Sequence, residues 1–164
     1  MLKIGDKAPS FDLPTHQGKS RSLSEYLLGG TVLLTFHRGT WWPNCTRRFG
    51  ELAQDLKLYR DLSVQVIAIV AQRPEKVKHY AEENEIPFNI LIDEQRTVLK
   101  QYGVWHRFGL DAWNIARPAL FLIDHSGTIR YTFIASRQDE FPGRDVIVRE
   151  IKKLRKDKER KELI

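Results

Sequence analysis

The sequence contains little sulfur: one cysteine, Cys45, and one methionine among 164 residues. A single cysteine cannot form an internal disulfide, which argues against a small secreted domain held together by disulfides. No apolar run approaches the ~20 residues that cross a bilayer, and residues 1–7 lack the apolar core of a signal peptide. We therefore expect a protein of the reducing cytoplasm.

Metal-binding patterns are also missing. The five histidines are scattered along the chain without the short spacings typical of a metal site. We predict no metal and no other cofactor. His37 has two interpretations: it helps to orient a site, or it is a strand histidine whose ring bonds a backbone carbonyl.

Charge is unevenly placed. The chain carries a net charge of +6, and residues 152–162 hold seven basic and three acidic side chains. Such a run can attract polyanions, but cations near the C-terminus of a helix are also favoured by the helix dipole. No aromatic side chain lies among these charges to stack on bases. We interpret residues 152–164 as the solvated end of a helix, and predict neither nucleic-acid nor membrane binding.

The hydrophobic pattern predicts an α/β fold in one domain over residues 1–164. Continuous apolar runs predict strands buried on both faces, and apolar residues at helical spacing predict helices between them. A mixed central sheet with helices on both faces follows.

The pattern also predicts individual elements. We expect a short hairpin before Gly18, a helix cap at Ser22, and a loop that carries Trp105, His106 and Trp113. The expected strands span residues 32–36, 64–70, 88–92, 119–124 and 128–134; the expected helices follow Ser22, Cys45 and Pro74, lie within 93–103, and contain Ile147, Ile151 and Leu154.

One segment, residues 31–48, has the composition of a reactive site. An apolar strand leads through a short turn to Cys45, where a helical pattern begins, with Pro43 suited to the first helical turn. Backbone N–H groups and the dipole at a helix start stabilise a thiolate, and Arg38, Arg47 and Arg48 add positive charge. We expect Cys45 to act as a nucleophile; the competing interpretation is a buried cysteine that fills space.

The order of these motifs resembles the peroxiredoxins, the alkyl hydroperoxide reductase/thiol-specific antioxidant branch of the thioredoxin-like superfamily. The matching segments cover about residues 2–155. They are Ile4–Leu13 with Gly18, the strand 32–36, the helix start at Cys45, and the late strand 118–124 followed by Gly127 and residues 129–131. The resemblance implies a thioredoxin-like fold with an N-terminal hairpin extension.

The resemblance also implies a mechanism. Cys45 is placed at the peroxidatic position, where its thiolate reduces hydrogen peroxide or an organic hydroperoxide and becomes a sulfenic acid. With no second cysteine, an external thiol must reduce it: a small thiol or a thioredoxin- or glutaredoxin-like partner. Arg117 is expected to stabilise thiolate and peroxide, and a homodimer is possible. The expected substrate pocket contains Arg38, Thr40, Trp42 and Pro118.

The sequence departs from the family pattern at three positions. Arg38 stands where the family has proline, Trp42 where it has threonine or serine, and Pro118 where it has arginine, with Arg117 one residue earlier. A cis bond before Pro118 would resemble the proline that faces the cysteine in thioredoxins.

A second alignment is also possible. It matches Trp41 to the tryptophan of a Trp-Cys-x-x-Cys motif, so that Trp42 replaces the first cysteine. The alternative function is then an inactive thioredoxin-like binding module.

Overall fold

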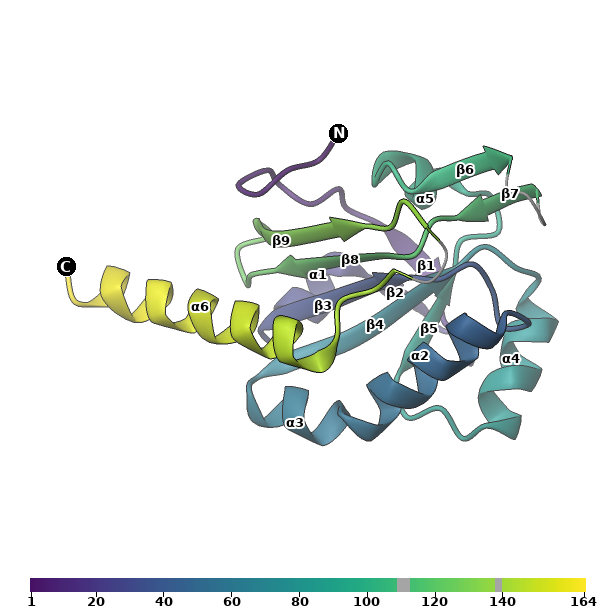
Figure 1. The fold of residues 1–164 in the computed structure, drawn as a ribbon, viewed down its shortest axis with the longest axis horizontal. Coiled ribbons are helices and arrows are strands. Elements are labelled where there is room, and N and C mark those ends of the chain that lie inside the picture. Colours follow the sequence, from purple (N-terminus) through teal and green to yellow (C-terminus); the bar gives the residue numbers. More distant parts are fainter. Residues whose placement is uncertain (109–112, 138–139) are drawn as a thin grey trace.

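A five-stranded sheet forms the centre of the computed structural model, which describes residues 1–108, 113–137 and 140–164 (Figure 1). The central strand β3 pairs in parallel with β4 and antiparallel with β8, so the sheet is mixed, as the hydrophobic pattern predicts. In spatial order the strands are β5 (Asn89–Ile92), β4 (Val64–Val70), β3 (Thr31–Phe36), β8 (Ala119–Ile123) and β9 (Ile129–Ile134).

Helices cover both faces of this sheet, as predicted (Figure 1). α1 (Leu23–Leu27) and α5 (Thr97–Gln101) lie on one face. The other face is covered by α2 (Pro43–Gln54), α3 (Leu56–Asp61), α4 (Pro74–Glu83) and α6 (Arg144–Glu162). No helix in the described ranges is long and apolar enough to span a bilayer.

Alternation along the strands divides the core in two. In β3, Leu33 packs with α2 and its neighbours, whereas Val32, Leu34 and Phe36 pack with α1 and α5. Neighbouring side chains of a strand point to opposite faces, so a continuous apolar run supplies both cores. Burying one such side chain contributes roughly 1.5–3 kcal/mol, which makes β3 a rigid base for the turn that follows it.

Two hairpins lie beside the sheet. β1 (Asp12–Pro14) pairs with β2 (Ser20–Ser22), so the predicted hairpin spans both sides of Gly18 instead of ending before it. β6 (Trp105–Phe108) pairs with β7 (Trp113–Ala116), and the predicted loop in this region is therefore wrong. Nothing is described of the Trp113 side chain. The ammonium group of Lys100 lies 4.8 Å from the ring centroid of Trp105.

Several helix ends differ from the predicted pattern. Ser22 caps α1 as predicted, its hydroxyl accepting from the Glu25 amide at 3.2 Å. The pattern after Cys45 predicts one helical face that includes residue 59, but the structure breaks it at Asp55 into α2 and α3. The helix predicted over residues 93–103 spans only Thr97–Gln101. Asp93 lies before this helix, and its carboxylate accepts a hydrogen bond from the Leu99 amide in the first turn at 2.8 Å.

Candidate active site

The expected site residues gather where β3 ends. The His37 amide donates to the Ile69 carbonyl at 3.1 Å, so the chain stays beside β4 after the last strand residue. In the antiparallel ladder Phe36 faces Ala119. Continuing this register brings the segment after Phe36 next to Pro118 and Arg117. Residues about 80 positions apart in the sequence therefore meet at the C-terminal end of β3, the central strand.

A short turn, residues 39–42, leads from this edge to α2. The Thr40 amide donates to Oε1 of Gln72 at 3.0 Å, and Nε2 of Gln72 donates to the Thr40 hydroxyl at 3.1 Å. The exposed Trp41 ring lies so close to Gly39 that a Cβ there would overlap it. Thr40 thus anchors the turn, and Gly39 leaves room for the Trp41 ring in this position.

Cys45 occupies the third position of α2. The first hydrogen bond of the helix runs from the Thr46 amide to the Trp42 carbonyl at 3.0 Å, and Pro43 is the first helical residue. The amides of Asn44 and Cys45 precede that bond and have no acceptor within the helix. The helix start predicted at Cys45 is therefore confirmed, but its side chain is only 1% exposed.

Tyr80 of α4 is a neighbour of the thiol that the sequence does not reveal. Burial, followed by the nearby Cys45 side chain, raises the pKa of Tyr80. Its ring centroid lies 5.6 Å from that of Phe49, which is one turn after Cys45 on α2. Tyr80 therefore packs on the residue one turn after Cys45. Helical spacing puts Tyr80 on the inner face of α4, but nothing in the sequence links it to residue 45.

Two buried arginines flank Cys45 along the chain. Arg38 is 5% exposed and its guanidinium lies 4.2 Å from the ring centroid of Trp42, the residue that caps α2. Arg48 is 2% exposed and lies one turn after Cys45; it donates to the Glu140 carbonyl at 3.1 Å, and its guanidinium is 4.7 Å from the ring centroid of Phe141. In contrast, Arg47 is exposed and pairs with Glu51. Cys45 and Arg48 are i, i+3 neighbours on α2.

Arg117 lies at the outer rim. Its side chain is exposed and its Nε atom donates to Nδ1 of His106 at 3.2 Å. Burial and the charges of Arg117 and Arg38 lower the pKa of His106, so both arginines are near this ring. Pro118 is buried, and no peptide bond in the described ranges is cis, so the cis bond considered before Pro118 is absent.

Trp42 packs against the core on the α2 side and keeps an unused donor. Its Nε1 atom is buried, and no described residue accepts a hydrogen bond from it. A buried N–H without an acceptor costs about 1–3 kcal/mol. Close packing of the ring does not explain why this N–H is left without an acceptor. A site that binds an oxygen atom does explain it, because the N–H then donates a hydrogen bond to that oxygen.

His37, the residue directly after β3, is fully buried. Its ring stacks on Phe49 with centroids 4.4 Å apart. Nε2 lies 2.8 Å from the Thr35 hydroxyl, which itself donates to the Ile67 carbonyl, so Nε2 carries the proton. The predicted carbonyl partner is therefore wrong: the partner is a hydroxyl. Burial, followed by the charge of Arg48, lowers the pKa of His37 to about 3.

This histidine predicts a pH dependence of stability. The folded state keeps His37 neutral, whereas the unfolded chain protonates it near pH 6.5, so the free energy of unfolding falls as pH drops from 6.5 towards 3. One such group contributes a slope of about 1.4 kcal/mol per pH unit within that window. We expect His37→Phe, which keeps the stacking on Phe49, to reduce the slope measured by urea unfolding. The exposed His79→Phe serves as control; equal slopes for the two variants would contradict the assignment.

Comparisons with known proteins show the family of this chain. A sequence profile described as the AhpC/TSA family matches residues 4–132. The chain belongs to the AhpC/TSA family. Among its relatives, the peroxiredoxin Bcp of Escherichia coli K12 is 33% identical over 134 residues, covering 80% of this chain and 85% of that protein. A putative peroxiredoxin bcp of Buchnera aphidicola is 35% identical over 135 residues, covering 80% and 84%.

Solved structures of peroxiredoxins share the fold. The peroxidoxin BcpB of Mycobacterium tuberculosis superposes with a TM-score of 0.81 at 24% identity, over 94% of this chain and 97% of that one. Peroxiredoxin 6 of Arenicola marina gives a TM-score of 0.85 at 18% identity, over 94% and 74%. The predicted thioredoxin-like fold and the resemblance to peroxiredoxins are thus confirmed.

Proposed function

We propose that this peroxiredoxin reduces hydrogen peroxide or an organic hydroperoxide at Cys45 and uses an external thiol as reductant. The observation that carries the proposal is the position of the only cysteine. Cys45 lies in the first turn of α2, three residues after Trp42 with its buried N–H, and between the buried Arg38 and Arg48 along the chain.

The reaction follows from these neighbours. The Cys45 thiolate attacks one oxygen of the hydroperoxide; an S–O bond forms, the O–O bond breaks, and the second oxygen leaves as water or alcohol after taking a proton. Cys45 becomes a sulfenic acid. The amides of Asn44 and Cys45 stabilise the thiolate and the charge that develops on the leaving oxygen. The Trp42 N–H supplies a donor in place of the family's hydroxyl.

Reduction requires two thiols from outside. The first attacks the sulfur of the sulfenic acid, and water leaves as a mixed disulfide forms. The second thiol displaces the Cys45 thiolate and leaves the reductant oxidised. A second copy of the chain does not help, since it offers only its own Cys45. Such chemistry suits the cytoplasm, where thiol reductants are kept reduced. The homodimer stays a prediction that sedimentation equilibrium tests.

The buried sulfur adds a requirement. Because Cys45 is only 1% exposed, a protein thiol reaches it only after residues around it move aside. Peroxide consumption with excess dithiothreitol tests the peroxidase without this requirement, since a small dithiol needs less room. No consumption above the protein-free rate would favour the alternative, a thioredoxin-like binding module.

We expect Arg117→Met to lower kcat/KM for peroxide only about threefold, or under 1 kcal/mol of transition-state stabilisation. The reason is exposure: water screens a charge at the rim, and Arg117 is held by His106 instead of by the cysteine segment. Stopped-flow peroxide consumption measures this. A loss of more than about a hundredfold would place Arg117 against the reacting oxygen, as the family resemblance implies.

A further inference from the structure

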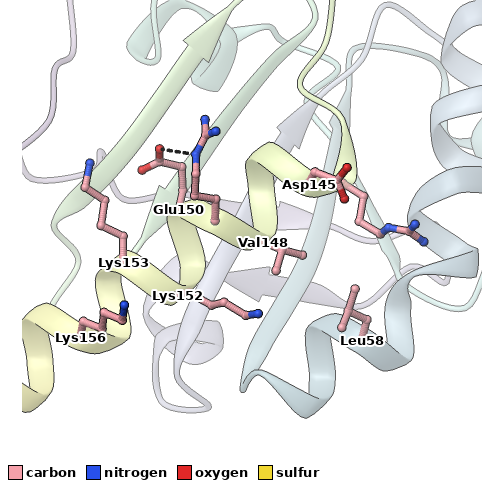
Figure 2. Close-up of a pocket in the computed structure, with 9 residues that line it drawn as sticks. Leu58, Asp145, Val148, Glu150, Lys152, Lys153 and Lys156 are labelled. Carbon is pink, nitrogen blue, oxygen red and sulfur yellow. Dashed lines mark ion pairs between the residues drawn. The ribbon is translucent and has the colours of Figure 1, made fainter.

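The basic helix α6 forms one wall of a surface groove of about 630 Å³ (Figure 2). The opposite wall is α3. Leu58 of α3 and Val148 of α6 point toward each other across it, and Lys152 extends from α6 toward α3. Five basic and two acidic side chains line the groove. It therefore combines a small apolar floor with a cationic rim.

The charges of this groove are only partly compensated. Arg144 pairs with Asp55 at 3.2 Å, and Arg149 pairs with Glu150 at 4.0 Å. Lys152, Lys153 and Lys156 are exposed, and no carboxylate of the described residues lies within ion-pair distance of them. Lys152 and Lys156 are one turn apart, so their ammonium groups form a row along α6.

A second groove connects this row to the helix that carries Cys45. Its volume is about 520 Å³, and it lies between α2 and the start of α6. Arg48, one turn after Cys45, and Phe141, on which Arg48 stacks, belong to its lining. Arg144 and Asp145 line both grooves, so the two grooves adjoin each other at the start of α6. A partner seated on the lysines would extend along this path toward α2.

We propose that these two adjoining grooves dock the external reductant, and that the reductant is a dithiol protein with an acidic face. The inference rests on the proposed function, which requires such a partner because the chain holds no second cysteine. The lysine row offers charge complementarity to carboxylates, and Leu58 offers a small apolar contact at its centre. Charged rims act mainly by steering encounter, so the surface raises the association rate of an acidic partner.

The test compares two double variants with equal change in net charge. Lys152→Glu/Lys156→Glu reverses the row, whereas Lys3→Glu/Lys19→Glu reverses two exposed lysines elsewhere that make no described ion pair. Turnover of peroxide is measured with a thioredoxin of negative net charge, kept reduced enzymatically, and separately with dithiothreitol. We expect the row variant to lose about tenfold in kcat/KM for thioredoxin at low salt, with the loss shrinking as ionic strength rises. Activity with dithiothreitol stays unchanged in both.

Neutral variants guard against effects on folding. Lys152→Gln/Lys156→Gln keeps good helix formers and should show a smaller loss in the same direction. Equal thioredoxin kinetics for the row variant and its control would overturn the proposal. So would tight binding of the wild-type chain to duplex DNA or anionic vesicles that the row variant alone loses, since the row would then serve phosphates. If the wild-type chain fails to consume peroxide with dithiothreitol, the proposed function itself fails.

Discussion

Cys45→Ser is expected to abolish peroxide consumption with excess dithiothreitol, down to the rate without protein. A serine hydroxyl is protonated at neutral pH and cannot form a sulfenic acid, so no residual route exists in a chain with one cysteine. Stability should fall, because a serine hydroxyl is costlier to bury than a thiol at a core position that is 1% exposed. The measurement is peroxide loss under dithiothreitol, with thermal unfolding of both proteins as control.

The same cysteine predicts a specific oxidation product. One equivalent of peroxide should add a single oxygen to the wild-type mass, without the loss of two hydrogens that an internal disulfide causes. A sulfenic acid that no neighbouring thiol captures is open to further oxidation, so excess peroxide without reductant should give the sulfinic acid and lasting inactivation. If the wild-type chain with dithiol is no faster than the serine variant, the peroxidase proposal is wrong.

The sheet was the more predictable part of this protein. The ranges 64–70 and 119–124 match β4 and β8 within one residue, because strands buried on both faces leave continuous apolar runs. The pair β6–β7 escaped prediction, since its residues mix aromatic and charged types without clear alternation. Asp55, which ends α2, likewise carries no breaker signal such as Gly or Pro.

The sequence predicted where the site lies along the chain, but not which residues contact one another there. The position of Cys45 at a helix start follows from local pattern, with Pro43 as its sign. Contacts such as that of Arg48 with the Glu140 carbonyl join residues 92 positions apart, and only the fold brings them together. The same holds for Tyr80 beside the thiol. The family resemblance ranks Arg117 above Arg48, and we propose the reverse order because Arg48 is buried and Arg117 is exposed.

That reversal gives the last prediction: Arg48→Met should lower kcat/KM for peroxide about a hundredfold. At 2% exposure the guanidinium acts in a medium where charge is poorly screened, one turn from the thiolate, and methionine keeps an unbranched stem of similar reach. A hundredfold corresponds to about 2.7 kcal/mol, within the range for removal of one oxyanion-stabilising donor.

The matched control is Arg47→Met on the same helix, where the side chain is exposed and paired with Glu51, and we expect no more than a twofold change. Thermal unfolding separates catalysis from folding, because the loss of the Glu140 bond destabilises Arg48→Met as well. Measured where both variants are fully folded, equal rates would remove Arg48 from the site and leave Arg38, stacked on Trp42, as the group that stabilises the charge.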